Sequence, residues 1–67
     1  MLTSKESFGK LKCLVDEKGL SFYKLGQETE MPSSFFSEWK KGKMMPKADK
    51  LKILAEYFDV PIEYFLE

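Results

Sequence analysis

A cluster of lysines in the second half of the chain is the feature best suited to chemistry. Between Lys40 and Lys52 the only acidic residue is Asp49, whereas no lysine occurs between Glu56 and Glu67. The clustered lysines are Lys40, Lys41, Lys43, Lys47, Lys50 and Lys52. Ammonium groups gathered in this way can bind phosphates, while an acidic end would stay away from them. The two runs are equally well explained as solvated surface, so charge alone leaves both interpretations open.

Catalytic and metal chemistry find little support in the composition. Cys13 is the only cysteine and the chain has no histidine. Neither a disulfide framework, a zinc site nor a nucleophile–base pair can therefore be assembled. Glu28 and Glu30 are isolated carboxylates and do not indicate an acid–base pair. We predict that the chain is not an enzyme and needs no cofactor or metal, and the sequence implies no small-molecule ligand.

The overall composition predicts one small folded domain over residues 1–67. Hydrophobic residues make up 43% of the chain, which is enough for a core. Basic and acidic residues balance at 11 each, and this neutrality counts against a typical basic nucleic-acid-binding domain. The sequence contains neither an apolar run long enough to span a membrane nor a secretory segment, so we expect a cytoplasmic protein.

Local signals predict helices on both sides of a short central turn. Thr3 and Glu6 fit a capping box, which starts a helix over residues 4–18 that Gly19 ends. Ser21 is suited to cap a second helix over residues 22–29. Gly26 lies inside that helix, where a glycine makes sense if another backbone segment comes close.

A third helix is expected from Pro32 to about Lys41, with Gly42 as its stop and Ser33 or Ser34 helping to cap it. Phe36 and Trp39 lie three residues apart and face the same way, so we expect them in the core. The opposite, outward face is polar and slim, as a helix entering a groove requires. Its residues are Ser33, Ser34, Ser37, Glu38 and Lys41.

Two further elements complete an all-α fold. Leu51, Leu54 and Phe58 recur at helical spacing and predict a helix over residues 47–58. After a turn at Asp59, residues 62–66 can form a last helical turn. The sequence therefore predicts five short helices, with a helix-turn-helix unit formed by the second and third.

Several stretches, in this order and spacing, resemble the Cro/C1-type (Xre-like) helix-turn-helix regulators of phages and bacteria. They are Phe8-Gly9-Lys10-Leu11, Lys18-Gly19-Leu20-Ser21, Leu25-Gly26, the segment from Ser34 to Lys43, and the closing segment from Val60 to Leu66. The resemblance covers nearly the whole chain. It implies a compact, five-helix, lambda-repressor-like domain that binds operator DNA as a homodimer, with the third helix in the major groove.

The resemblance also implies which side chains contact DNA. The candidates for base or groove contact are Ser33, Ser34, Phe35, Ser37, Glu38 and Lys41. The candidates for phosphate contact are Ser21, Lys40, Lys43 and Lys47. Serine reads bases loosely, Glu38 can accept from cytosine N4, and Phe35 can touch a thymine methyl group.

Three departures from the family pattern weaken the expected DNA contacts. Glu30 replaces a common turn glycine, Phe22 stands where a DNA-contacting glutamine is common, and the chain has no arginine. These departures predict low affinity per monomer and strong salt dependence. The missing arginine, the zero net charge and the exposed aromatic residues together motivate an alternative function. The alternative is a protein-interaction module, similar to an antirepressor or an antitoxin, that keeps the fold without binding DNA.

Overall fold

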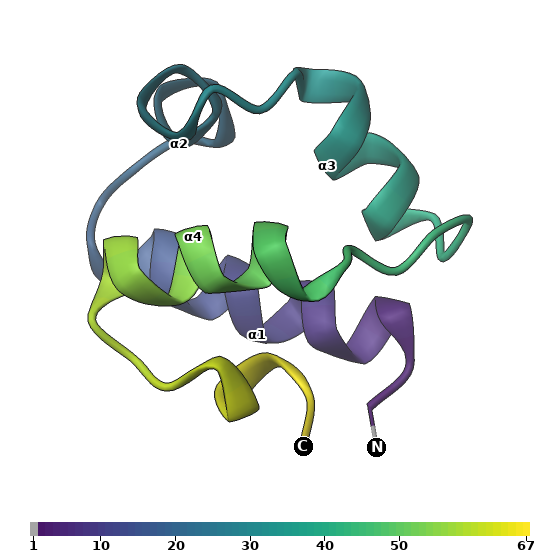
Figure 1. Cartoon of the computed structure of the whole chain (residues 1–67). Coiled ribbons are helices and arrows are strands. Elements are labelled where there is room, and N and C mark those ends of the chain that lie inside the picture. The colour runs from purple at the N-terminus through teal and green to yellow at the C-terminus, as the bar shows by residue number, and fades with distance from the viewer. Residues whose placement is uncertain (1) are drawn as a thin grey trace.

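Helices account for nearly all the regular structure of the chain. The computed structural model describes residues 2–67. Its elements are α1 (Ser4–Glu17), α2 (Phe22–Thr29), α3 (Ser33–Lys40), α4 (Ala48–Phe58) and the 3₁₀ helix η1 (Ile62–Phe65). Helices α2 and α3 form one end of the molecule, α1 and α4 lie across its middle, and η1 lies at the other end (Figure 1). This arrangement confirms the predicted all-α fold.

The prediction of five α-helices is wrong, because the last element is a 3₁₀ turn. The amide of Tyr64 donates to the carbonyl of Pro61 at 3.0 Å, and that of Leu66 donates to Glu63 at 3.0 Å. Both bonds span three residues, which is the 3₁₀ pattern and is common in short helical pieces. The tighter turn suits a segment of four residues that must direct one ring, that of Phe65, into the core.

The helix starts are capped as predicted in α1 and α2 but not in α3. The amide of Glu6 donates to Thr3 Oγ1 at 3.2 Å, and the Thr3 amide donates to Glu6 Oε1 at 2.9 Å. The Lys24 amide donates to Ser21 Oγ at 3.1 Å. The expectation that Ser33 or Ser34 caps α3 is wrong, because Pro32 is the N-cap and no side chain accepts there. Both serines already lie inside the helix.

Two helix ends use left-handed residues that are not glycine. Glu30 ends α2 at φ 59°, and Asp59 ends α4 at φ 57°. Such a conformation costs a side-chain-bearing residue about 1–2 kcal/mol. After the left-handed turn at Glu30, the Met31 amide donates to the Gly26 carbonyl at 2.9 Å, and the Met31 side chain is buried. Glu30 therefore takes the left-handed conformation of the turn glycine that it replaces.

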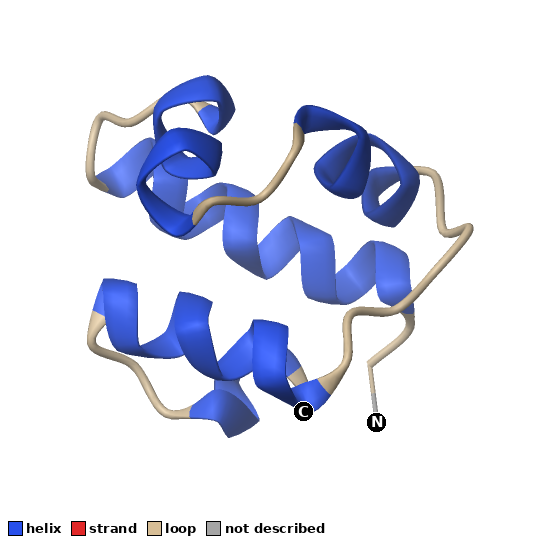
Figure 2. Cartoon of the chain, turned by 45° about the horizontal axis from the view of Figure 1, so that its top comes forward, coloured by secondary structure: helices blue, strands red, loops and turns tan. Residues whose placement is uncertain are grey.

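The core is built around one tryptophan and a set of aromatic rings. Trp39 is completely buried, with Phe8 edge-on at 5.6 Å and Phe65 at 6.4 Å between ring centroids. Edge-to-face pairs of this kind add about 0.5–1.5 kcal/mol each beyond their buried area. Through these rings Trp39 joins α3 to α1 and η1. Figure 2 shows that the described part of the chain consists of helices joined by loops.

Gly26 sets how closely α2 and the following turn approach. A Cβ atom at this position would lie 2.6 Å from the carbonyl oxygen of Met31. Only glycine therefore allows the turn to fold back against α2 at this distance, as the sequence predicted. The angle between α2 and α3 depends on this contact.

Within residues 2–67, none of the helices has the length and apolar character required to cross a membrane.

Candidate nucleic-acid interface

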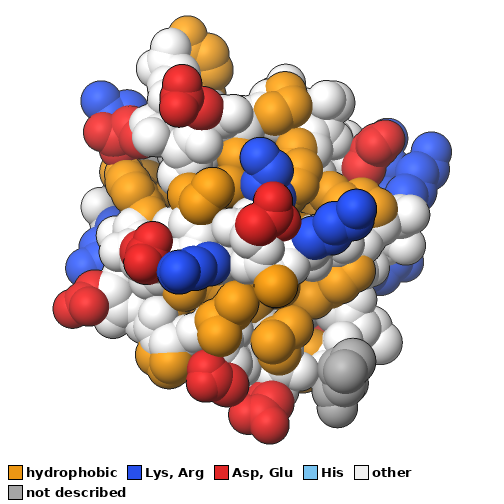
Figure 3. Space-filling model, viewed as in Figure 1, with side chains coloured by type: hydrophobic (Ala, Val, Ile, Leu, Met, Phe, Trp, Pro, Cys, Tyr) orange, Lys and Arg blue, Asp and Glu red, His pale blue; other side chains and the backbone are white. Residues whose placement is uncertain are grey.

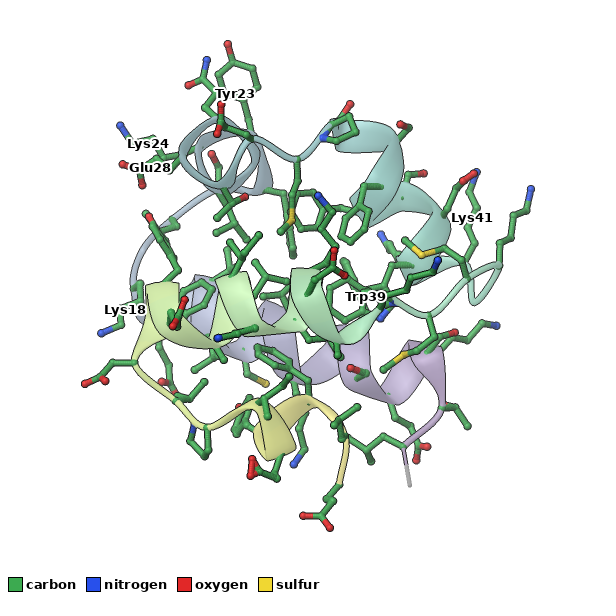
Figure 4. The ribbon with its side chains drawn as sticks, in the orientation of Figure 1. Lys18, Tyr23, Lys24, Glu28, Trp39 and Lys41 are labelled. Atoms are coloured by element: carbon green, nitrogen blue, oxygen red, sulfur yellow. The ribbon has the colours of Figure 1, made fainter. Side chains whose placement is uncertain are left out.

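One face of α3 is polar and exposed, and no other described part of the chain covers it. Ser34, Ser37, Glu38 and Lys41 are exposed, whereas Phe36 and Trp39 are buried. At helical spacing, Ser34 and Lys41 lie near the centre of this outward face, and Ser37 and Glu38 lie on either side. Figure 4 shows Trp39 directed into the molecule and Lys41 directed away from it. The serine surface is therefore available to a partner.

Within the described residues, the lysines around this face have no acidic partner that would neutralise them. Lys40, Lys41, Lys43 and Lys47 are all exposed. In the part of the chain that the structure describes, the ion pair found is that of Lys12 with Asp16, at 3.7 Å. The chain turns back after α3 at Gly42, with φ 77°, and the Lys43 amide donates to the Glu38 carbonyl at 3.0 Å. Unpaired ammonium groups therefore follow the end of α3 into the next loop.

Two of the predicted contact residues lie at the margins of the outward face. Ser33 is exposed at the start of α3, beside Phe22 of α2. Phe35 is half-buried, and its ring packs edge-on against Phe36 at 5.4 Å and Trp39 at 6.1 Å. The ring of Phe35 therefore serves the core first, and only its exposed edge is free for a partner.

The start of α2 combines one polar and one aromatic residue. The Ser21 hydroxyl is exposed and already accepts from the Lys24 amide, but its proton remains free to donate. The Phe22 ring stacks on Phe8, with 5.2 Å between centroids and 14° between planes. Phe22 therefore belongs to the aromatic cluster of α1 and α3, and Ser21 is the polar group at this end.

Tyr23 and Gln27 also face solvent near α3, although they are not among the contact residues predicted from the sequence. Tyr23 is 73% exposed, and Gln27 Nε2 donates to its hydroxyl at 3.0 Å. Both side chains border a hollow that reaches Met31 and Ser33. Their spacing of four residues in α2, on the side away from buried Leu25, is the signal that could have identified them.

A second exposed surface, of different character, lies on α4 and η1. Ile53 and Tyr57 of α4 are 40% and 38% exposed. Ile62 of η1 and Leu66 after it are half-buried and pack against the core. Figure 3 shows hydrophobic side chains gathered where α4 and η1 lie, among scattered charged groups.

The Tyr57 hydroxyl donates to a Glu28 carboxylate oxygen of α2, and this bond raises the pKa of Tyr57.

Comparison with known proteins agrees with this geometry. The family described as "helix-turn-helix domain", which is of the Xre/Cro-C1 kind, matches residues 9–67. Among curated proteins and among solved structures, no match is found. The family supports DNA binding and transcription regulation in general, and its members are typically not enzymes. With α2, α3 and the exposed face of α3 as described, the chain belongs to the helix-turn-helix domain family of the Cro/C1 kind.

Proposed function

We propose that this protein is a sequence-specific regulator of transcription that acts as a repressor and binds operator DNA as a homodimer. The α3 helix would enter the major groove, with Ser34, Ser37, Glu38 and Lys41 directed at base edges. The major groove of B-DNA is wide enough for a helix and presents a different pattern for each base pair. Repression would require only that the bound protein block access to the operator.

The observation that carries this proposal is the uncovered serine face of α3 between unpaired lysines. Small hydroxyl side chains at Ser34 and Ser37 let the helix backbone approach the floor of the groove closely. Lys40, Lys43 and Lys47 would bind phosphates, together with the hydroxyl of Ser21 at the start of α2. Phosphate contacts fix the position of the protein, and base contacts supply the sequence preference.

The exposed apolar surface of α4 and η1 supports a homodimer. Ile53 and Tyr57 are the exposed large side chains of this surface. Burying them between two copies would remove apolar area from water. The subunit measures 27 × 24 × 21 Å, so two copies can lie side by side on successive major grooves, about 34 Å apart.

A binding-site selection experiment tests the proposal. Random duplex DNA is selected with the purified chain at 50 mM salt, and the enriched sites are measured by electrophoretic mobility shift at 50 and 200 mM salt. We expect a palindromic site, saturable binding and a large loss of affinity at the higher salt. Absence of saturable, salt-sensitive binding to any selected site would show that the proposal is wrong.

The alternative, a protein-interaction module without DNA binding, is favoured by one observation. Tyr23 is the most exposed large hydrophobic residue of the described chain and lies at the α2–α3 end. Aromatic residues exposed in this way are enriched at protein interfaces. If selection finds no DNA site, a pull-down with the wild-type chain and with Tyr23→Ala would test this function, and the variant should lose the partner.

A further inference from the structure

A hollow open to solvent lies between the first three helices, beside the proposed DNA surface. Its volume is about 280 Å³. Phe8, Phe22 and Phe36 form its aromatic lining. Ser33 and Ser37 of α3, Lys12 of α1 and Lys40 of α3 complete the lining. The described chain places no carboxylate in this lining.

The aromatic lining comes from three different helices and is held in place by ring contacts. Phe22 of α2 stacks on Phe8 of α1 at 5.2 Å and packs at a tilt against Phe36 of α3 at 5.6 Å. Phe8 and Phe36 are buried, and Phe22 is half-buried. The rings are therefore fixed by the core before any ligand arrives, which reduces the entropy lost on binding.

The polar groups of the hollow favour an anion. Lys40 has no carboxylate partner within the described residues, and Lys12 is paired only with Asp16, at 3.7 Å. Both side chains of that pair are largely exposed, so the pairing is weak and Lys12 can turn to another anion. Serine hydroxyls can donate to a carboxylate as well.

We propose that this hollow binds a small aromatic carboxylate of one or two rings. The ligand ring would pack against Phe22 and Phe36, and its carboxylate would accept from Ser37 and pair with both Lys12 and Lys40. Aromatic rings attract one another in stacked or edge-to-face arrangements. The volume lies just below the range of pockets for drug-sized ligands, which limits the ligand to a small one.

Such a ligand would also control DNA binding, and this part rests on the proposed function. Ser33, Ser37 and Lys40 belong both to the hollow and to the proposed DNA surface. A carboxylate placed among them adds negative charge where a phosphate would approach. The ligand and the operator would therefore compete, so each would lower the affinity of the protein for the other by the same factor.

The first experiment measures ligand binding to the DNA-free protein. Amide NMR spectra of the labelled full chain are recorded with 2-naphthoate, with neutral 2-naphthamide, with ring-free cyclohexanecarboxylate and with inorganic phosphate. We expect saturable shifts around Phe22, Ser37 and Lys40, with 2-naphthoate binding at least about tenfold more tightly than each control. Shifts that do not saturate would overturn the proposal. If inorganic phosphate binds as tightly as 2-naphthoate does, the hollow is only a phosphate site and the proposal also fails.

Two lysine variants separate this site from general surface charge. Lys12→Gln removes one cation of the hollow and is not among the proposed DNA contacts, so it should weaken 2-naphthoate about threefold. Lys52→Gln, an exposed lysine of α4 outside the hollow, should leave the affinity unchanged. Lys12→Gln should bind 2-naphthoate less tightly than the wild type does. If both proteins bind 2-naphthoate equally tightly, and also bind 2-naphthamide equally tightly, the predicted anion contact is contradicted.

The second experiment adds selected operator DNA. Saturating 2-naphthoate should weaken DNA binding at least about tenfold, and 2-naphthamide should not. If 2-naphthoate binds but no DNA site exists, the aromatic-carboxylate site stands and the proposed regulator function fails. If DNA binds and 2-naphthoate does not, the site fails and the regulator function stands. Binding of both without competition would overturn the regulatory part.

Discussion

Ser7 is a buried polar residue of the core, and its hydroxyl has no hydrogen-bond partner in the described part of the chain. Ser7 is fully buried in α1, and the indole nitrogen of Trp39 is the other buried group without a partner. An unsatisfied buried polar group costs about 1–3 kcal/mol. At the residue scale, the molecule therefore carries a cost that the sequence alone did not indicate, because it depends on which neighbours surround the hydroxyl.

We predict that Ser7→Ala raises the free energy of unfolding by about 1 kcal/mol, measured by chemical denaturation. The variant removes the unpaired hydroxyl and adds helix propensity. Ser37→Ala is the matched control, because it gains the same helix propensity at an exposed site of α3. A gain at Ser7 no larger than that at Ser37 would show that the buried hydroxyl costs nothing.

The division between base and phosphate contacts is also tested residue by residue. Lys43→Ala should weaken binding to selected and random DNA alike and lower the salt slope by about 1 per subunit. Ser37→Ala should instead change the preference among selected sequences while affecting random DNA little. Mobility shifts on both kinds of DNA measure the difference. Equal effects of the two variants on both would contradict the assigned roles.

At the scale of elements, local signals predicted the helices and their ends well. Thr3 with Glu6, Ser21 and Gly19 act within one turn of the chain, so their types and spacing were sufficient. The 3₁₀ form of residues 62–65 was missed, because its apolar pattern is the same as that of an α-helical turn. The Tyr23–Gln27 pair and the aromatic hollow were missed as sites for another reason: their roles depend on how α1, α2 and α3 pack together.

The approach of α2 to its turn predicts opposite effects for two glycines. Gly26→Ala should lower the free energy of unfolding by about 1–3 kcal/mol, because its Cβ would meet the Met31 carbonyl oxygen at 2.6 Å. Gly9→Ala, in α1 with nothing within 4 Å of the added Cβ, should raise it by up to about 1 kcal/mol. Thermal denaturation of both variants checks the contrast, and similar effects would contradict it.

The contact between α2 and α4 predicts a dependence on alkaline pH. The hydrogen bond to Glu28 raises the pKa of Tyr57 in the folded protein above that of the unfolded chain. Its contribution to stability is therefore fully present below about pH 10 and is lost as the pH rises through the folded pKa. Tyr57→Phe should be less stable than the wild type at neutral pH, and the difference should shrink above pH 10. A difference independent of pH would argue against this bond.

At the scale of the whole molecule, zero net charge conceals a division of surfaces. Lysines without partners follow the end of α3, whereas exposed apolar groups and acidic residues lie towards α4 and η1. The charge run in the sequence predicted the first surface, because lysines rarely enter a core. The apolar surface was not predictable in detail. Ile53 and Phe65 are both large apolar residues followed directly by a leucine, but only Phe65 is buried.

The apolar surface provides the test of the homodimer. Ile53→Lys should leave the fold intact, because Ile53 is 40% exposed, but should keep the protein monomeric. Analytical ultracentrifugation with operator DNA present and absent measures the oligomeric state. The DNA affinity of Ile53→Lys should fall because the dimer is lost. Lys52→Ala, at a neighbouring exposed position of α4, is the control. An Ile53→Lys protein that still dimerises would place the interface elsewhere.

The two ends of the chain lie together, where the Leu2 amide donates to the Leu66 carbonyl at 3.0 Å. They lie at the end of the molecule opposite α2 (Figure 1). A fluorophore, a purification tag or a covalent linker between two copies can therefore be attached at either terminus away from α2. The same proximity makes the chain suited to circular permutation.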